Sequence, residues 1–264
     1  MPIFAGTMQL HLPTNKNIYF ASDQHFGAPN YDASRRREKQ FLQWLESIEK
    51  QAYAVFLLGD LFDFWFEYRK VVPKGFVRTL GKLAQMKDNG VLIYAFAGNH
   101  DLWMKDYFLT ELGIPVFHQP QRIQIGKKIF LLGHGDGLGP GDKGYKRMKK
   151  VFVNPLSKFL FRWLHPDLGV SLAQYLSLRN RLISGEENVQ FQGVQNEWLV
   201  QYCQEKLVSQ HYDYFIFGHR HLPLEISVGK NALYLNTGDW IHHNTYGVFN
   251  GQVLKLEKWE SKND

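Results

Sequence analysis

The sequence contains one cysteine, Cys203, among its 264 residues. A single thiol cannot form an internal disulfide, so the chain is not a disulfide-stabilised secreted scaffold. No apolar run approaches the roughly 18–20 residues that a membrane-spanning helix needs. The first sixteen residues also lack the basic region and continuous apolar region of a secretory signal. With 44% apolar residues, the composition excludes a disordered or fibrous protein. We therefore expect a cytoplasmic globular protein.

Basic residues outnumber acidic ones by 31 to 25, which indicates an anionic partner such as nucleic acid, a membrane surface or a phosphate-bearing substrate. The excess lies in one segment, Lys143 to Ile183, which has nine basic residues and one acid and therefore a charge of +8. The rest of the chain, at 6 − 8, carries −2. Large apolar residues recur in this segment at the spacing of one helix face: Phe152, Leu156, Phe159, Leu160, Trp163 and Leu164. This pattern is typical of an interfacial helix on an anionic membrane, and equally of a helix packed on its own core with a solvated basic face.

Short apolar, β-branched or aromatic runs predict strands that alternate with helices, which indicates an α/β class. The expected strands are Asn17–Ser22, Tyr53–Leu58, Val91–Ala97, Gln121–Ile125, Lys128–Leu132, Tyr212–Phe217, Leu224–Val228, Ala232–Leu235, Tyr246–Phe249 and Gln252–Leu256. The expected helices are Ser34–Lys50 with Ser34 as N-cap, Gly75–Asn89 and Asp101–Leu112. Because the later strands are closely spaced, part of the sheet should be antiparallel or mixed. Residues 139–208 contain no expected strand, and we interpret them as a helical cap inserted into a single domain 1–264.

Five of the expected strands are followed by loops rich in Asp, Asn and His. The loops are Asp23-Gln-His25, Gly59-Asp60-Leu-Phe-Asp63, Gly98-Asn99-His100-Asp101, Gly133-His134-Gly-Asp136 and Gly218-His219-Arg-His221. Ligands of open α/β sheets bind at the carboxyl ends of strands, so all five loops can face one crevice. The glycine that opens each of the last four loops lets the chain turn sharply and approach a bound ion or phosphate closely.

The side chains in these loops suit a pair of divalent cations. Carboxylate, carboxamide and imidazole groups without thiolate favour Mn²⁺, Fe²⁺ or Zn²⁺ over a structural zinc site. Each loop alone is a weak signal, because Gly-Asp often simply closes a strand. Five such loops in series are not needed by a packed core, in which unpaired polar groups are costly. The sequence therefore predicts a two-metal centre.

Taken together, the five loops resemble the signature of the calcineurin-like metallophosphoesterases, from residue 17 to about residue 237. The resemblance implies a four-layer sandwich, in which two mixed β-sheets pack face to face between outer helices. It also implies two metal ions that clamp the oxygens of a phosphoryl group during in-line displacement. The ligands implied for one ion are Asp23, His25, Asp60 and His221. The ligands implied for the other are Asp60, Asn99, His134 and His219.

The same resemblance assigns catalytic roles to His100 and Asp101. His100 would protonate or stabilise the leaving oxygen without binding metal, and Asp101 would orient it. A histidine beside two cations needs such a carboxylate to fix its tautomer. Asp63 and Asp136 would support the metal ligands from behind.

Residues 59–65 and 134–145 resemble a narrower family, the UDP-2,3-diacylglucosamine pyrophosphohydrolases of lipid A biosynthesis. These enzymes also have a helical insertion after the fourth metal loop. The resemblance implies hydrolysis of UDP-2,3-diacylglucosamine to UMP and 2,3-diacylglucosamine 1-phosphate (lipid X), by attack of a metal-bridged hydroxide on the α-phosphorus. It implies Mn²⁺ as the metal and a peripheral location on the inner face of the bacterial inner membrane. It does not imply an obligate protein partner.

The basic, apolar insertion fits such a substrate, since a diphosphate attracts cations and acyl chains need an apolar groove. The candidate substrate contacts are Asn99, Asp142, Lys143, Tyr145, Lys146, Arg147, Phe152, Phe159 and Trp163. For at least half of the apolar candidates, packing in the core is the alternative. The chain departs from the best-known members at His100, where they carry Arg, and around residues 67–74.

Two other functions compete with this one. A broader phosphodiesterase or phosphatase acting on nucleotides or other lipid phosphoesters would use the same metal centre, but it has no need of an apolar cap. A basic nucleic-acid- or membrane-binding module with a degenerate metal site is disfavoured, because every ligand position is filled and binding alone does not require His100. We expect no nucleic-acid partner. His242 and His243 are as consistent with the surface as with the substrate rim, and Cys203 with a buried helix face.

Overall fold

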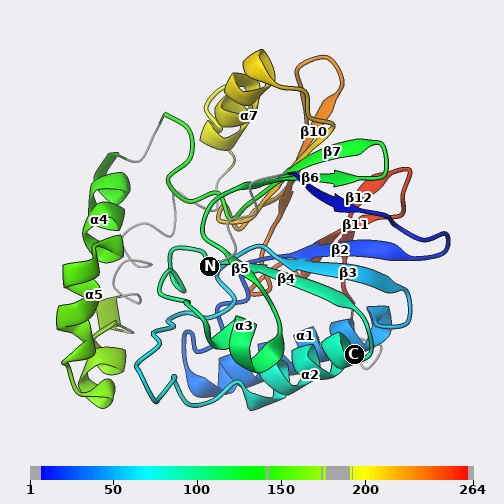
Figure 1. The fold of residues 1–264 in the computed structure, drawn as a ribbon. Helices are drawn as coiled ribbons and strands as arrows, with labels where there is room; N and C mark the ends of the chain where they lie inside the picture. The colour runs from blue at the N-terminus through cyan, green and yellow to red at the C-terminus, as the bar shows by residue number, and fades with distance from the viewer. Residues whose placement is uncertain (1–6, 141–142, 174, 177–190, 192, 261–264) are drawn as a thin grey trace.

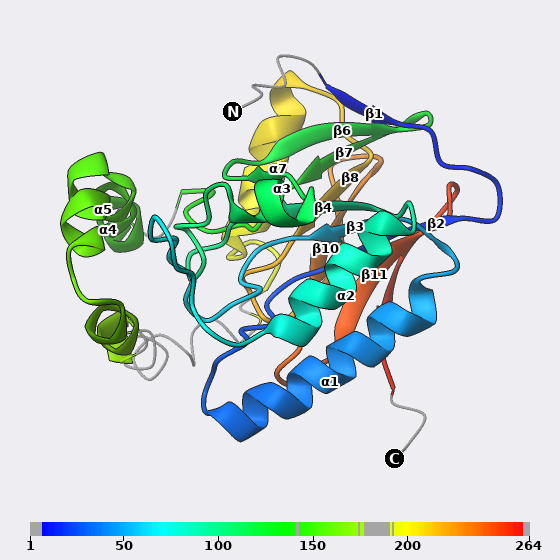
Figure 2. The ribbon, with the colours of Figure 1, turned by 60° about the horizontal axis from the view of Figure 1, so that its bottom comes forward.

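The apolar runs of the sequence form two six-stranded sheets that lie face to face in the computed structural model, which describes residues 7–140, 143–173, 175–176, 191 and 193–260 (Figure 1). The first sheet has the order β1 (Met8–Leu10), β6 (Gln121–Ile125), β7 (Lys128–Leu132), β8 (Tyr214–Phe217), β10 (Ala232–Thr237), β9 (Pro223–Val228). The second has the order β12 (Leu254–Lys258), β11 (Thr245–Phe249), β2 (Asn17–Ala21), β3 (Ala52–Leu57), β4 (Leu92–Phe96), β5 (Val116–Phe117). Helices cover the outer faces, so the expected four-layer α/β sandwich is confirmed (Figure 2).

Strand direction determines where the polar loops meet. β2, β3 and β4 are parallel neighbours in one sheet, and β7, β8 and β10 are parallel neighbours in the other. Parallel strands end at the same edge of a sheet, so the loops that follow them gather there. Antiparallel pairing is confined to β6–β7, β9–β10, β11–β12 and β11–β2 among the named strands, which makes both sheets mixed.

Three apolar clusters hold the layers together. Between the sheets lie residues such as Phe20, Phe56 and Phe130, whose rings stack at 5.5 and 6.2 Å. The second sheet is covered by α1 (Tyr31–Ile48) and α2 (Val77–Asp88), and Trp44 on α1 is fully buried against it. The first sheet is covered by α7 (Trp198–Ser209), in which Cys203 is buried as expected. Burying each large side chain contributes roughly 1.5–3 kcal/mol, which fixes the sheets as a rigid support for the loops.

Two helix starts differ from the sequence prediction. Helix α1 begins at Tyr31 because Asn30 is its N-cap, accepting a hydrogen bond from the amide of Ala33 at 3.0 Å. Ser34, expected as N-cap, instead lies inside the helix and accepts from the amide of Gly27 at 2.7 Å. Helix α3 (Tyr107–Leu112) begins six residues later than expected. Its first amides bind the buried carboxylate of Glu67, which lies in the stretch 67–74 that departs from the family pattern.

Strand ends also differ where the pattern is short. Strands β1 and β5 were not predicted, because three and two residues carry too little periodicity. Strand β12 begins at Leu254 rather than at Gln252. The side chain of Asn250 accepts hydrogen bonds from the amides of Gln252 and Val253, at 3.0 and 2.9 Å, and holds these residues in a turn.

Residues 143–162 of the basic segment form two helices, α4 (Lys143–Val153) and α5 (Pro155–Arg162), rather than one, and residues 166–173 are also helical. Asn154 starts α5, since its side chain accepts from the amide of Leu156 at 2.8 Å and Pro155 cannot continue α4. Both helices lie beside the sandwich (Figures 1 and 2). No helix among the described residues is both long enough and apolar enough to cross a membrane.

Candidate metal centre

Three groups of His and Asp side chains lie at the shared edge of the two sheets, each with its potential ligand atoms within 4.8 Å of one another. The groups are Asp23 with His25 and His221, His25 with Asp63 and His100, and Asp60 with His134 and His219. Their members come from the loops after β2, β3, β4, β7 and β8. The structure therefore brings all five sequence-predicted loops together.

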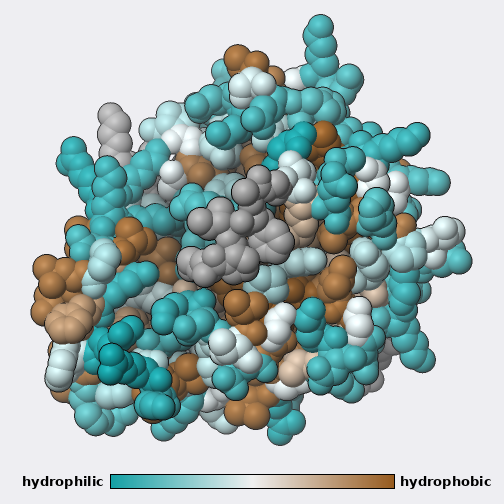
Figure 3. Space-filling view, in the orientation of Figure 1, coloured by the Kyte–Doolittle hydropathy of each residue, from teal (hydrophilic) through white to brown (hydrophobic). Residues whose placement is uncertain are grey.

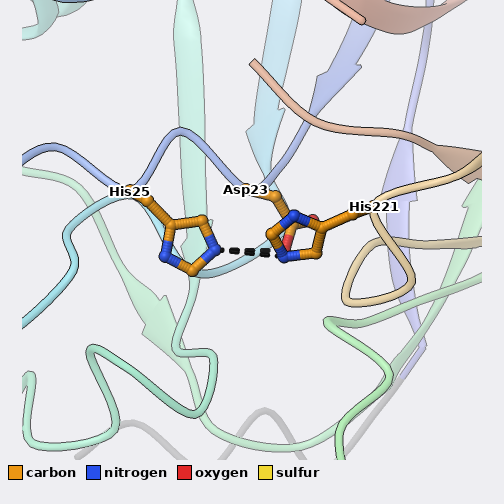
Figure 4. Close-up of side chains that lie close together, drawn as sticks. All are labelled: Asp23, His25 and His221. Atoms are coloured by element: carbon orange, nitrogen blue, oxygen red, sulfur yellow. Dashed lines mark hydrogen bonds and ion pairs between the residues drawn. The ribbon is translucent and has the colours of Figure 1, made fainter. Parts of the chain in front are cut away.

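The first group joins the two sheets (Figure 4). The rings of His25, after β2, and His221, after β8, face each other with their Nε2 atoms 3.2 Å apart. The carboxylate of Asp23 lies behind them, its Oδ1 at 3.7 Å from His25 Nε2 and 3.3 Å from His221 Nε2. Three side chains thus point polar atoms at one small volume.

The group of Asp60, His134 and His219 lies next to the first group and is built around Asp60. His134 Nε2 lies 3.3 Å from Asp60 Oδ2 and 3.1 Å from Asn99 Oδ1. Asp60 Oδ2 is also 3.6 Å from His25 Nε2, which belongs to the first group. The ring of His219 packs edge-on against that of His134, with centroids 5.0 Å apart. Asp60 therefore lies between this group and the group of Asp23, His25 and His221.

Each of three imidazoles turns its Nε2 into the cluster and uses its Nδ1 for another contact. His134 Nδ1 faces the carbonyl oxygen of Leu58 at 2.8 Å, His221 Nδ1 faces Asp239 Oδ2 at 3.2 Å, and His25 Nδ1 faces Asp63 Oδ1 at 3.5 Å. Such outer contacts fix the ring orientation and tautomer of metal-binding histidines. Asp239 was not predicted, although Gly238 and Asp239 follow β10 as Gly59 and Asp60 follow β3.

The backbone at the cluster takes unusual conformations. Asp23, His25, Asp60, His219 and His221 all have positive φ angles, between 46° and 69°. This left-handed region is unfavourable for residues with a Cβ and persists only where the surroundings enforce it. Two of the predicted glycines are needed for space, because a Cβ on Gly98 would collide with the side chain of Asp60, and one on Gly218 with that of Asp23.

Burial and neighbouring charges shift the titration of these groups in the metal-free protein. Burial opposes charge on Asp23, but the nearby His221 and His25 lower its pKa to about 2. Burial likewise opposes charge on His134, but the carboxylate of Asp60 raises its pKa to about 10. Burial lowers the pKa of His25 to about 3, and burial with the charge of His134 lowers that of His219 to about 4. At neutral pH, His25 and His219 are thus neutral, as metal binding requires.

The side chains present fit divalent cations. Asp23 Oδ1 is buried and accepts no hydrogen bond within the described part of the chain. The Nε2 atoms of His25 and His221 converge on this oxygen. A buried oxygen that accepts no hydrogen bond is costly unless a cation lies beside it. The donor set has oxygen and nitrogen atoms and no sulfur, which suits Mn²⁺, Fe²⁺ or Zn²⁺.

A different carboxylate from the expected one lies beside His100. His100 Nδ1 is 3.0 Å from the carbonyl oxygen of Asp63 and 3.4 Å from its Oδ1. The carboxylate of Asp101 instead accepts from the amides of Gly98 at 2.7 Å and Leu61 at 2.9 Å. Burial, together with the charge of Asp60, raises the pKa of Asp101 to about 7. Asp101 therefore ties the loops after β3 and β4 together.

Helices α4 and α5 lie against the same loops. Asp136 binds the hydroxyl of Tyr145 and the ammonium of Lys149, both on α4. The ring of Phe161, on α5, packs 4.7 Å from the rings of Phe66 and Trp103. Phe161 was not among the predicted apolar residues of this segment, whereas those that were are exposed rather than in the core: Phe152 37%, Phe159 53%, Leu160 59%, Trp163 77% and Leu164 40%.

The other predicted substrate contacts are spread over this region. Lys146 donates to the carbonyl of Gly139, and Arg147 is exposed on α4. Lys143 begins α4, and Asp142 lies outside the described residues. The amides of His242 and His243 both donate to Asp239 Oδ1, at 2.9 and 3.1 Å, so these residues support the loop that contacts His221.

A pocket opens between α4 and the loops after β4, β5 and β7. The open space there, with solvent outside the protein surface included, amounts to about 280 Å³. Its polar lining includes His118, Gln119, His134, Asp136 and Lys149. Its apolar lining is Phe96, Ala97, Phe117, Pro120 and Leu138. A ligand there would have both an apolar wall and polar groups beside the cluster.

Comparison with known proteins agrees with this geometry. The family model described as calcineurin-like phosphoesterase matches residues 16–223. A UDP-2,3-diacylglucosamine hydrolase of Porphyromonas gingivalis is 40% identical over 256 residues, which cover 92% of this chain and 97% of that protein. A protein of the same name from Ectopseudomonas mendocina is 31% identical over 228 residues, covering 84% and 90%. The chain therefore belongs to the calcineurin-like phosphoesterases and is a metal-dependent hydrolase.

Proposed function

We propose that the protein hydrolyses the diphosphate of UDP-2,3-diacylglucosamine to UMP and 2,3-diacylglucosamine 1-phosphate. The observation that carries this proposal is the 40% identity to the Porphyromonas gingivalis hydrolase over almost the whole of both chains. The buried His/Asp cluster supplies the side chains that such a reaction needs. The basic and apolar helices beside it suit a substrate that combines phosphates with acyl chains.

We propose two divalent cations, one at the group of Asp23, His25 and His221 and the other at the group of Asp60, His134 and His219. One ion would be held by Asp23, His25, Asp60 and His221. The other would be held by Asp60, Asn99, His134 and His219. When bound, such a pair polarises phosphoryl oxygens and lowers the pKa of a water molecule. We propose Mn²⁺ as the metal, as the resemblance to the UDP-2,3-diacylglucosamine pyrophosphohydrolases implies; the oxygen and nitrogen donors fit it, as they also fit Fe²⁺ and Zn²⁺.

We propose that His100 donates a proton to the departing phosphate oxygen and that Asp63 orients it. Its ring is 16% exposed, so one side remains open to a ligand while its Nδ1 faces Asp63. Asp101 acts differently from the sequence expectation, since it holds Asp60 and Gly98 in place through their amides, at 3.3 and 2.7 Å. That contact keeps the two sides of the site in register.

We propose that residues 139–208 include a cap over the site and that the two ends of the substrate lie on different parts of it. The pocket beside His134 has the mixed lining expected for a nucleoside. The exposed apolar side chains of α4 and α5 are suited to acyl chains. Within the cap, α7 packs on the first sheet, so α4 and α5 are the parts that contact substrate.

We further propose that α4 and α5 rest on an anionic membrane surface. Figure 3 shows hydrophobic side chains gathered at the edge of the molecule where these helices lie in Figure 1. Trp163 is 77% exposed there, and Leu156 63%. Monomeric soluble proteins rarely leave such contiguous apolar patches uncovered. Basic residues of the same helices would meet anionic headgroups, which places the enzyme beside its lipid substrate.

The first prediction tests the substrate. With Mn²⁺, the protein should release UMP from UDP-2,3-diacylglucosamine, measured by chromatography. Asp60→Asn should lower kcat by more than about 100-fold, because the Asp60 carboxylate lies beside both His25 and His134. This loss exceeds the one expected for a residue that only hydrogen-bonds to a metal ligand. Asp88→Asn, at the exposed end of α2, should leave kcat unchanged. Rapid hydrolysis of bis-p-nitrophenyl phosphate with none of the lipid nucleotide would replace this function with a broader phosphodiesterase, the function that Gly-Asn-His favours.

The second prediction concerns proton transfer. His100→Asn should lower kcat by about 10²–10⁴-fold, the range for a lost general acid, and leave Mn²⁺ affinity close to that of the wild type. Asp63→Asn should lower kcat by about 10–100-fold, because the imidazole is present but less well oriented. An unchanged kcat would remove His100 from the reaction.

The third prediction follows from the raised pKa of His134. The metal-free protein holds a proton there until pH about 10, and a metal ligand must be unprotonated. Mn²⁺ binding at pH 7.5 should therefore release a proton, and the apparent affinity should rise between pH 6 and 8. Calorimetry in buffers of different ionisation enthalpy measures the release. Binding of two ions with no proton release would contradict the assignment of His134 as a ligand.

The fourth prediction concerns the membrane. The protein should float with vesicles containing phosphatidylglycerol, and less with phosphatidylcholine alone. Trp163→Ser combined with Leu160→Ser should reduce flotation several-fold, because both side chains are exposed on the apolar face. Val208→Ser on α7 is the matched control, since Val208 is 89% exposed on a different face. Equal flotation of all three proteins would refute the docking surface.

A further inference from the structure

Two arginines that have no part in the reaction are buried directly behind the ligand loops. Arg37, on α1, is 5% exposed, and Arg220, between His219 and His221, is 1% exposed. Arginine is rarely this buried, because its charge must be compensated by hydrogen-bond or ionic partners. The guanidinium of Arg37 contacts the loop after β2, and Arg220 itself belongs to the loop after β8, so each arginine connects a loop that carries proposed metal ligands to a helix.

Arg37 holds the loop after β2 by its backbone. Its Nε donates to the carbonyl oxygen of Gln24 at 2.5 Å, and one terminal nitrogen donates to those of His25 at 2.6 Å and Ala28 at 2.5 Å. The planar guanidinium fits this arrangement because its donors leave in fixed directions. These bonds orient the peptide groups on both sides of His25, and so its ring.

Arg220 holds the loop after β8 by its side chain. Its Nε donates to Glu197 Oε1 at 2.8 Å, and Glu197 is itself 1% exposed. The guanidinium also lies 4.3 Å from the centre of the Trp198 ring. Glu197 and Trp198 begin α7, which packs on the first sheet. The ion pair therefore connects a rigid helix to the residue between two proposed ligands.

These contacts occur where the backbone is least favourable. Asp23 and His25 in one loop, and His219 and His221 in the other, have φ angles of 58°, 46°, 69° and 52°. Without an external hold, each of these residues would relax toward negative φ, and its side chain would turn away from the cluster. A ligand set must be held within a fraction of an ångström before the metal arrives if it is to bind tightly.

We propose that Arg37 and Arg220 are positioning residues that set the metal affinity of the cluster before any ion binds. The inference rests on the ligand assignment under the proposed function. The two arginines act on different ligands. The loop held by Arg37 supplies Asp23 and His25 to one ion, whereas the loop held by Arg220 supplies His221 to that ion and His219 to the other. Losing Arg37 should weaken one site, and losing Arg220 should weaken both.

The experiment is Mn²⁺ titration calorimetry on the metal-free full-length protein, with thermal melting of the same samples. Arg37→Lys and Arg220→Lys keep the charge but not the directed fork of donors. Each should weaken Mn²⁺ binding by about 10–100-fold, as other outer contacts of metal ligands do, at one site for Arg37→Lys and at both for Arg220→Lys. Arg122→Lys, on β6 and bound to Thr7, is the matched control and should bind as the wild type does.

A second Arg220 variant guards against misfolding. Arg220→Met with Glu197→Leu removes both buried charges together, which avoids leaving one charge unpaired. It should melt normally and still bind Mn²⁺ more weakly at both sites. A merely structural role would lower the melting temperature and leave the affinity of the folded protein unchanged.

The outcomes separate this proposal from the proposed function. If the wild type binds no Mn²⁺, the two-metal assignment fails. If the wild type binds two ions and folded variants bind within twofold of it, the positioning role fails. If neither Arg220 variant folds even with Mn²⁺ present, Arg220 is a folding residue and its part of the proposal is overturned. Hydrolysis is assayed separately and does not enter this comparison.

Discussion

Two ionised carboxylates buried within one small cluster are the constraint on which the rest of the site depends. Asp23 and Asp60 are at most 1% exposed, and their pKa values lie below the usual range despite burial, because histidines surround them. Like charges this close repel strongly where water is excluded. Protonated His134 offsets part of that repulsion in the metal-free protein. Divalent cations would offset this repulsion more fully, so metal binding and the ordering of the ligand loops are energetically coupled.

The fold solves this problem in layers. Parallel strands from two sheets deliver the ligand loops to one edge, and glycines at Gly98 and Gly218 leave room for the carboxylates. Positive φ angles then turn the ligands inward. Buried side chains hold the strained loops from behind: Asp101 through the amides of the loops after β3 and β4, Arg37 through carbonyl groups, and Arg220 through α7. The sheets alone would bring the ligands near one another without fixing their directions.

The strands and the ligand loops were predictable because their signals are local. An apolar run followed by Gly and a polar residue is visible without knowledge of the fold. Asp239 and Arg37 were missed because their roles come from tertiary contacts, across 18 residues to His221 and 12 to His25. For the same reason, Asp101 was expected to orient its neighbour His100, whereas folding places Asp63 there. The predicted helix limits were wrong where a single side chain determines the start of a helix, as Asn30, Glu67 and Asn154 do for α1, α3 and α5.

The apolar face of α4 and α5 is unfavourable for the opposite reason: large apolar side chains are exposed to water there, whereas in the metal cluster charged groups are buried. Phe161 of α5 packs against Phe66 and Trp103 in the loops after β3 and β4, so the helix pair is anchored to these loops while Trp163 and Leu156 remain exposed. An intramolecular core would have reversed this arrangement. A substrate with a polar diphosphate and two acyl chains needs both environments within its own length. Under the proposed function, the same two helices would supply both, because Tyr145 and Lys149 contact Asp136 while Leu156, Phe159 and Trp163 are exposed.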